Sequence, residues 1–348
     1  MDRTQLSSGL TGIHHISAMT GDAQANIDFY TRLLGMRIVK RTVNQDDVSV
    51  YHLFYADGKG QAGTDLTFFA FNNIARNHPG AGEINEIVLR VERNESIDWW
   101  KKRFDTFGVK YGEETALAGH RLLPFEDFEG QRLALMSDEG GEVTIPGGEP
   151  WEHATVPAEH YITGLGAVSI TTARPEQTLA TLTDIMGFEI IDDQQGPEHP
   201  DHRIVLLKIH TGGPNGLMVV HVRPDLPFAR NGRGGVHHVA FRVPTFEAHH
   251  EWNQYLKGRG VHVTDEIDRF YFKAMYFREP GGVLYEISSD GPGFHTDEPG
   301  ETMGEQLTLP PAFAPYRAQI EPQLQPLDSS RARTTTEYGQ PVKEEAKA

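Results

Sequence analysis

The chain contains an internal duplication in which equivalent positions lie 152 residues apart. Four pairs keep this offset: Gly12 with Gly164, Gly35 with Gly187, Glu86 with His238, and Asp138 with Asp290. Agreement at a single shift over such a length is difficult to obtain by chance, and self-similarity of this kind marks repeated structural units. The sequence therefore predicts four related units in the order A-B-A′-B′.

Each predicted unit has the same succession of elements. An apolar strand comes first, an amphipathic helix follows and ends near a glycine, and two or three further strands complete the unit. The expected helices cover residues 23–34, 97–107, 176–186 and 246–258. Strands are expected at 48–55 and 65–71 in the first unit, and at 269–278 and 283–288 in the last. We therefore expect an α+β fold of four tandem βαβββ modules, arranged as two duplicated halves.

The same pattern sets the expected boundaries. Residues 10–145 form the N-terminal half and residues 160–292 form the C-terminal half, and apolar periodicity lapses between them, over residues 139–157. Residues 293–325 read as an extended C-terminal segment. Residues 326–348 are polar and rich in Ser, Thr, Arg, Glu and Lys, which predicts a disordered tail.

Metal-competent side chains lie in three short apolar runs. The strand starts Gly12-Ile13-His14-His15-Ile16-Ser17 and Gly235-Val236-His237-His238-Val239-Ala240 lie 223 residues apart, and Val283-Leu284-Tyr285-Glu286-Ile287 follows the second. Burying His and Glu is costly unless a partner such as a metal ion compensates. Two imidazoles and one carboxylate are the ligand set that holds non-heme Fe(II) with positions left open.

The repeat narrows this ligand set to three residues. The position of His15 is Ala167 in the third unit, and the position of Glu286 is Ala134 in the second. Only the first and last units keep the metal-binding chemistry. A single site would therefore combine His15 with His238 and Glu286, which requires the two ends of the repeat to meet in space.

Composition excludes several classes of protein. The chain of 348 residues has no cysteine, which rules out disulfides, thiol catalysis and Fe–S clusters. The formal charge of -17 argues against a nucleic-acid partner. No run approaches the ~20 apolar residues of a membrane span, and residues 1–10 lack a signal-peptide core. We expect a cytoplasmic protein that forms a homo-oligomer.

These motifs resemble those of the vicinal oxygen chelate superfamily. Within it, the opening Gly-Ile-His-His-Ile-Ser, Phe29-Tyr30, Leu34-Gly35-Met36 and Lys40-Arg41-Thr42-Val43-Asn44 look like the hydroquinone-type ring-cleaving dioxygenases. The resemblance covers about residues 10 to 325. It implies an Fe(II) enzyme, with Mn(II) as the alternative metal, that acts on a small aromatic diol together with O2.

The resemblance also implies roles for individual residues. The metal ligands would be His15, His238 and Glu286, and the outer residues would be His14, His237, Ser17, Arg269 and Tyr276. The two outer histidines could move protons, and Arg269 and Tyr276 could stabilise negative charge. Adjacent residues of a regular strand face opposite sides, so both histidines of a pair can reach one metal only through a twist or bulge.

Two other functions fit the same residues. A glyoxalase-like isomerase or lyase would need a fourth protein ligand, which only Asp65 could supply. A non-catalytic protein could bind a small ligand in the same fold, although such a protein has no need of metal ligands in register. Of the other histidines, we expect His199, His202 and the His249-His250 pair to lie at the surface.

Overall fold

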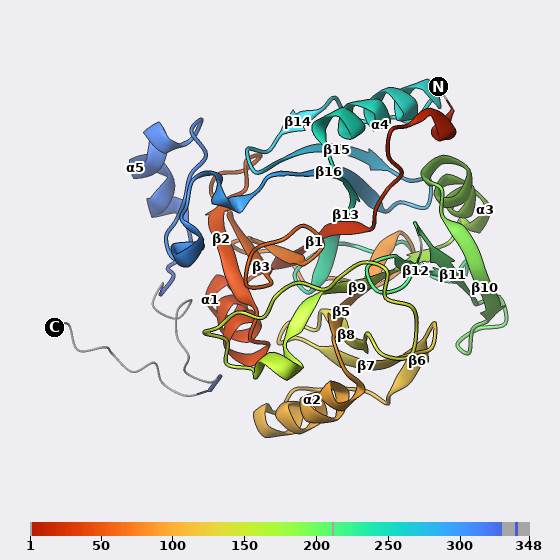
Figure 1. The fold of residues 1–348 in the computed structure, drawn as a ribbon, viewed down its shortest axis with the longest axis horizontal. Helices are drawn as coiled ribbons and strands as arrows, with labels where there is room; N and C mark the ends of the chain where they lie inside the picture. Colours follow the sequence, from red (N-terminus) through yellow and green to blue (C-terminus); the bar gives the residue numbers. More distant parts are fainter. Residues whose placement is uncertain (1, 211, 329–337, 340–348) are drawn as a thin grey trace.

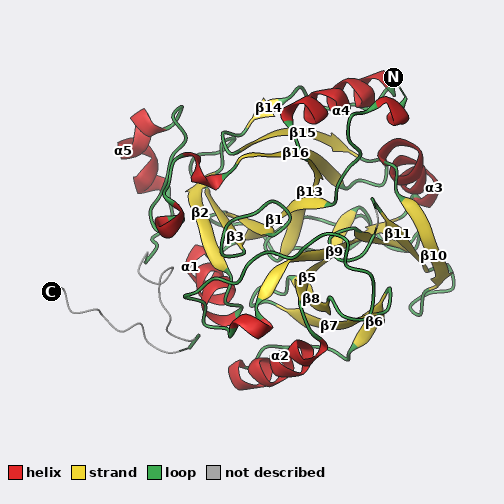
Figure 2. Cartoon of the chain, viewed as in Figure 1, coloured by secondary structure: helices red, strands yellow, loops and turns green. Residues whose placement is uncertain are grey.

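The computed structural model describes residues 2–210, 212–328 and 338–339. Its strands form two eight-stranded sheets, with the orders β14-β15-β16-β13-β1-β4-β3-β2 and β10-β11-β12-β9-β5-β8-β7-β6. Each sheet curls into a half-barrel, and Figures 1 and 2 show the strands in the centre of the molecule with the helices at its periphery. The predicted tail at 326–348 lies almost entirely outside the described residues.

All four units have the predicted βαβββ order, which confirms the fold class. The first unit contains β1 (Ile13–Thr20), α1 (Ala23–Ile27), β2 (Arg37–Val43), β3 (Tyr51–Ala56) and β4 (Asp65–Ala70). The second contains β5 (Glu83–Val91), α2 (Asn94–Phe107), β6 (Thr115–Leu117), β7 (His120–Glu126) and β8 (Arg132–Ser137). The third contains β9 (Ile162–Thr172), α3 (Pro175–Ala180), β10 (Glu189–Gln195), β11 (Arg203–Lys208) and β12 (Leu217–Val222). The fourth contains β13 (Gly235–Val243), α4 (Phe246–Gly258), β14 (Ile267–Asp268), β15 (Phe272–Arg278) and β16 (Leu284–Pro292).

The first and last units share one sheet, as a common site requires. Strand β1 pairs antiparallel with β13 at the centre of that sheet, and β5 pairs antiparallel with β9 at the centre of the other. The duplication therefore produces one sheet from the outer two units and one from the inner two. Among the described residues, no helix has both the length and the apolar character needed to cross a membrane.

Glycines end the helices where the sequence predicts. Gly108 closes α2 and Gly187 closes the π-helical turn that follows α3, and both adopt left-handed backbone conformations, with φ of 67° and 87°. A side chain is strained in this conformation, whereas glycine is not. The chain can therefore turn sharply from each helix into the next strand.

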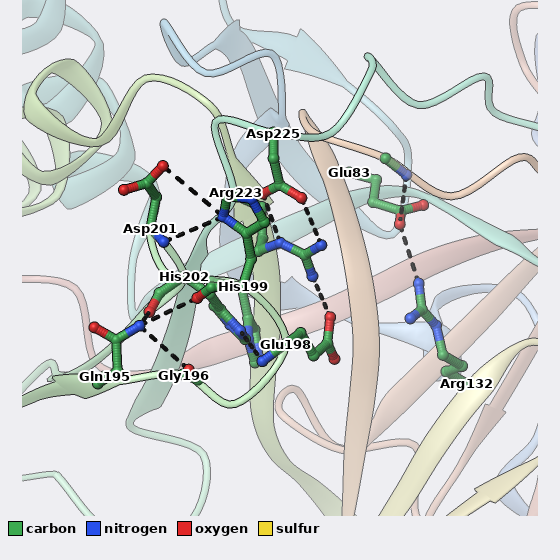
Figure 3. Close-up of polar contacts among 12 residues, drawn as sticks. Glu83, Arg132, Gln195, Gly196, Glu198, His199, Asp201, His202, Arg223 and Asp225 are labelled. Carbon is green, nitrogen blue, oxygen red and sulfur yellow. Dashed lines mark hydrogen bonds and ion pairs between the residues drawn. The ribbon is translucent and has the colours of Figure 1, made fainter.

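Three details of the sequence prediction are wrong. The strand expected at 48–55 begins at Tyr51, after a turn at residues 48–50. The strand expected at 269–278 begins at Phe272, because Phe270 has a left-handed φ of 70° and breaks the extended backbone between β14 and β15. His202 and His249 are buried. Figure 3 shows His202 inside a hydrogen-bonded loop, where its carbonyl accepts from Gln195 and Gly196. A sequence pattern does not reveal such a loop, because the loop covers the imidazole with its own backbone.

Residues 293–325 consist of short helical turns, including α5 (Arg317–Ile320), joined by irregular chain. This segment lies along the edge strand β2 (Figure 1), to which it adds a bridge between Arg41 and Leu307. Every residue of β2 is buried, whereas every residue of β10, its repeat equivalent, is exposed. The C-terminal segment thus covers the edge of only one sheet, the one that contains the paired histidines.

Lys40 of β2 holds this segment in place. Its side chain is fully buried, its ammonium lies 2.7 Å from Asp297 and also contacts Glu298, and it packs over the ring of Tyr271 at 4.8 Å. The Tyr271 hydroxyl donates a hydrogen bond to Asp297. Two partly buried carboxylates therefore share one buried cation.

Replacing Lys40 by Met should lower the free energy of unfolding by about 3 kcal/mol, because removing one partner of a buried ion pair leaves uncompensated charge. Urea unfolding followed by circular dichroism measures this loss. The matched control is Lys59→Met, whose ion pair with Glu149 is 59% and 66% exposed and should contribute less than about 1 kcal/mol. Equal effects of the two substitutions would contradict this account.

Candidate metal centre

The β1–β13 pair carries one extra residue on each strand. A register shift just before His15 leaves His14 unmatched in β13, and a second shift just after Ser17 leaves His237 unmatched in β1. Bulge residues depart from the strict alternation of strand side chains. Both histidines of a pair can therefore approach the same site, which removes the geometric objection raised by the sequence.

Three buried side chains converge where β1, β13 and β16 meet. The Nε2 atoms of His15 and His238 lie 3.2 Å apart, and they lie 3.5 Å and 2.8 Å from Oε2 of Glu286. Within the described parts of the chain, this is the group of three His, Asp or Glu side chains whose ligand atoms could hold a metal ion. The structure brings these three predicted residues together.

His14 fixes which nitrogen of His15 faces the cluster. The carbonyl of Ser289 can only accept a hydrogen bond, so Nε2 of His14, 3.1 Å away, must donate one. Burial lowers the pKa of His14 well below its usual value, and the charge of His15 lowers it further, so the ring is neutral. Its Nδ1 then accepts from Nδ1 of His15 at 2.9 Å. In the neutral form of His15, which a metal ligand requires, this hydrogen bond places the lone pair on Nε2, directed at the cluster.

The second pair repeats this contact. Nδ1 of His237 lies 2.8 Å from Nδ1 of His238, and burial, together with the charge of His238, lowers the pKa of His237 to about 4. Neither His14 nor His237 lines the pocket described below. Both lie behind their neighbours and contact the ring nitrogen that faces away from the cluster.

Glu286 has one satisfied and one unsatisfied oxygen. Oε1 accepts a hydrogen bond from the Ser288 hydroxyl at 2.5 Å, whereas Oε2 is buried and makes no hydrogen bond of normal geometry among the described residues, although Nε2 of His238 lies 2.8 Å from it. Burial by itself would raise the pKa of this carboxyl, but His15 and His238 hold it well below its usual range. An ionised, buried and unsatisfied oxygen beside an imidazole lone pair is the environment of a cation site.

A pocket of about 430 Å³, including its opening to solvent, lies beside the three side chains. Aromatic walls and a polar rim surround it, and the residues are His15, Thr42, Asn44, Gln45, Asp46, His52, Phe54, Phe69, His238, Arg269, Tyr271, Phe272, Tyr276 and Glu286. Apolar walls with a few convergent polar groups are typical of a site for a small organic ligand.

Tyr276 and Arg269 lie on one wall of the pocket. The Tyr276 ring packs edge-on against His238, with centroids 5.8 Å apart, and its hydroxyl accepts a hydrogen bond from Nε of Arg269 at 3.3 Å. Burial raises the pKa of Tyr276 well above its usual value, and the charge of Glu286 raises it further. The hydroxyl therefore keeps its proton and can donate it in a hydrogen bond.

A hydroxyl chain connects Ser17 to a histidine that the sequence did not single out. Ser17 lies 2.8 Å from the Thr67 hydroxyl, which in turn lies 3.0 Å from Nε2 of His52. His52 lines the pocket between Phe54 and Phe69, whereas Ser17 does not line it. A lone histidine in a predicted strand gives no signal until the fold shows that β3 forms a pocket wall.

The position symmetric with Glu286 is occupied by Thr67. In the last unit Ala240 pairs with Glu286, and in the first unit its equivalent, Ser17, pairs with Thr67. A four-ligand site would need a carboxylate or imidazole here. Asp65, the fourth ligand considered from sequence, is buried with a raised pKa, caused by burial and then by Asp57, and it lies outside both the cluster and the pocket lining.

The second sheet does not carry the three-residue cluster at its equivalent positions. Its equivalent positions carry Glu86, Ala134, Ala167 and Val219, and three of these belong to an apolar cluster with Leu206. Equivalent backbone positions therefore carry mostly packed apolar side chains in one sheet and polar side chains in the other.

Comparison with known proteins identifies the family. The family model of the "Glyoxalase/Bleomycin resistance protein/Dioxygenase superfamily" matches residues 12–135 and 164–287. The chain is 42% identical over 318 residues to MhqA of Bacillus subtilis (strain 168), covering 91% of this chain and 99% of MhqA, which carries the provisional name of a ring-cleaving dioxygenase. This protein belongs to the glyoxalase/bleomycin resistance protein/dioxygenase superfamily.

A further relative and two solved structures extend this similarity. The chlorohydroquinone/hydroquinone 1,2-dioxygenase of Sphingobium indicum is 28% identical over 323 residues, covering 91% of this chain and 96% of that protein. A crystal structure of a Bacillus subtilis protein, provisionally named a dioxygenase, superposes with a TM-score of 0.82 at 34% identity, over 93% of this chain and 99% of that one. Glyoxalase I from Zea mays shares the fold alone, with a TM-score of 0.58 at 12% identity over 80% of this chain and 92% of that one.

Proposed function

We propose that this protein is a non-heme Fe(II)-dependent dioxygenase that cleaves the aromatic ring of hydroquinone- or catechol-like substrates with O2. The observation that carries the proposal is the buried cluster of two imidazoles and one carboxylate that opens onto an aromatic-walled pocket. The dioxygenase names of its relatives support it.

In this proposal His15, His238 and Glu286 are the metal ligands. The unsatisfied Oε2 of Glu286 and the lone pair of His15 Nε2 fit a divalent cation. His14 and His237 act on the metal through their neighbours, because a hydrogen bond to the outer ring nitrogen fixes the tautomer and orientation of a ligating histidine. Ferrous iron, when bound, supplies open coordination positions for the substrate oxygen and O2, together with an electron for O2.

The protein residues would hold the aromatic ring of the substrate and form hydrogen bonds with its phenolic hydroxyl. The aromatic side chains Phe54, Phe69 and Phe272 exclude water and pack against the substrate ring. Burial lowers the pKa of His52 well below its usual value, and the charges of His15 and His238 lower it further, so the His52 ring is neutral and would accept a hydrogen bond from a phenolic hydroxyl.

Tyr276 completes the proposed pocket. Arg269 donates to the oxygen of Tyr276, and the Tyr276 hydroxyl, which faces Glu286 in this structure, would turn its hydrogen toward a negative substrate oxygen. In this proposal Tyr276 and Arg269 have the stabilising role that the family resemblance implies, and His52, rather than His14 or His237, contacts the phenolic hydroxyl.

The isomerase alternative is disfavoured by the residue at the fourth position. Thr67 stands where a four-ligand site needs a second carboxylate or an equivalent ligand, and its hydroxyl is already engaged with Ser17 and His52. A non-catalytic binder is disfavoured because it gains nothing from a buried, unsatisfied carboxylate oxygen, which costs folding free energy.

The proposed ligands can be tested by metal content. His15→Ala, His238→Ala and Glu286→Ala should each fold but retain little Fe(II) after anaerobic loading, because each variant loses one of three ligands. Metal analysis and circular dichroism measure both properties. His250→Ala, on a side chain that is 60% exposed, serves as the control and should keep full occupancy. Full occupancy in any one of the three variants would remove that residue from the site.

The reaction can be tested with an oxygen electrode. The Fe(II)-loaded protein should consume one O2 per ring with hydroquinone, chlorohydroquinone or catechol, and oxidation to Fe(III) should abolish consumption because Fe(III) has no electron to pass to O2. Anaerobic turnover of a hemithioacetal, with no oxygen uptake on any diphenol, would support the isomerase function instead.

The open fourth position can be tested by filling it. Thr67→Glu should raise metal affinity about tenfold or more and reduce oxygen uptake by a similar factor, because a fourth protein ligand occupies a position that substrate or O2 needs. Thr67→Gln has nearly the same volume without the charge and controls for the loss of the hydroxyl and for crowding. Equal metal affinity in the two variants would show that residue 67 does not face the metal.

A further inference from the structure

We propose that Asp46 makes this pocket selective for uncharged aromatic diols by occupying the guanidinium that would otherwise bind a ring carboxylate. This inference rests on the proposed function, since it concerns the substrate class of the same site. It starts from the charges on the pocket wall rather than from the metal ligands.

Arg269 is the one arginine or lysine among the described residues that line the pocket. A ring carboxylate would be recognised most readily by such a guanidinium, whose parallel N–H groups match both carboxylate oxygens. In this structure that fork is already filled. Nη1 and Nη2 of Arg269 donate to the two oxygens of Asp46 at 3.1 Å and 2.9 Å.

The negative charge of Asp46 also repels an anionic substrate. It lies in the loop between β2 and β3 and lines the pocket, although its side chain is 72% exposed. An anionic substrate would therefore meet a carboxylate at the rim and a neutralised cation on the wall. Specificity built in this way discriminates by penalising the wrong ligand rather than by improving the right one.

Arg269 keeps its place without Asp46. Its backbone N–H donates to the carbonyl of Phe272 and its carbonyl accepts from Gln45 Nε2, at 2.9 Å and 2.8 Å. Its guanidinium packs over the Tyr276 ring at 5.4 Å, and Nε donates to that hydroxyl. Neutralising Asp46 would thus expose a held guanidinium on the pocket wall, ready to receive another carboxylate.

The contribution of the ion pair to stability should be small, because Asp46 is largely exposed and such pairs contribute about 0–1 kcal/mol. The Asp46–Arg269 pair therefore contributes little to the free energy of folding. Because it occupies the one guanidinium among the described lining residues, its main effect is on which ligands bind.

The test compares binding of hydroquinone with binding of 2,5-dihydroxybenzoate, which is hydroquinone carrying one carboxylate. Calorimetry on the Zn(II)-loaded protein, which does not turn over, gives both dissociation constants without relying on activity. The wild type should bind the carboxylated ring about tenfold more weakly or worse. Asp46→Asn should lower the ratio of the dissociation constant of 2,5-dihydroxybenzoate to that of hydroquinone by about tenfold, which corresponds to about 1.4 kcal/mol.

The neighbouring Asp47 provides the matched control. Asp47→Asn changes the net charge by the same amount, keeps an oxygen for the hydrogen bonds from Ser49, and lies outside the pocket lining, so the ratio should not change. In an Arg269→Gln background, Asp46→Asn should produce a much smaller gain, because it relieves only the repulsion by Asp46 and the receiving guanidinium is gone.

Three results would overturn the inference: an unchanged ratio in Asp46→Asn, the same shift in Asp47→Asn, or an equally large gain in the Arg269→Gln background. Failure of the proposed function would look different. In that case the Fe(II)-loaded wild type would consume no oxygen with hydroquinone, whatever the binding ratio of the variants.

Discussion

The antiparallel pairing of β1 with β13 is the interaction on which the rest of the structure depends. It joins the first unit to the last, and it brings residues 223 positions apart in the sequence to within hydrogen-bonding distance. The two bulges in this pair place a histidine behind each central histidine. Without the pairing there is no convergence of imidazoles, and without the bulges the outer pair could not contact the inner pair.

The two sheets show how one frame can serve two purposes. In the inner sheet, the positions equivalent to the cluster are filled mainly by small apolar side chains, which pack into a core. In the outer sheet, the same positions carry groups that would be costly to bury without a counter-charge. At these positions the inner sheet is stabilised by apolar packing, whereas the outer sheet has a polar cluster in place of that packing. The duplicated backbone accommodates both, because main-chain hydrogen bonds pair the strands in the same way in each sheet.

The C-terminal segment completes the outer sheet. It covers β2, places Asp297 against Lys40, and through Tyr271 reaches the wall of the pocket. The exposed counterpart of this edge, β10, carries Glu189, Asp192 and Asp193, and charged edges of this kind limit pairing with other strands. The C-terminal segment, which belongs to none of the four repeated units, therefore contacts the pocket wall through Tyr271 without lining the pocket itself.

The fold could be predicted from the sequence because the repeat supplied independent checks. Hydrophobic periodicity, terminal glycines and a constant offset agreed on four βαβββ units. The predicted succession of strands and helix along the chain is correct in each unit. His15, His238 and Glu286 could be singled out because the repeat shows where the inner units carry other residues. Arg269 was placed in a strand that begins only at Phe272, because a left-handed residue at 270 leaves no hydrophobic signature.

The sequence by itself determined the units, the three convergent side chains and the absence of thiol chemistry. The tertiary structure alone decided that Thr67 occupies the fourth position, that His52 lines the pocket, and that Asp46 meets Arg269 across two units. The physical reason is that these relations depend on register and on contacts between β-strands and loops far apart in the chain. Local periodicity reports which face of an element is apolar, but it does not report which distant side chain that face will meet.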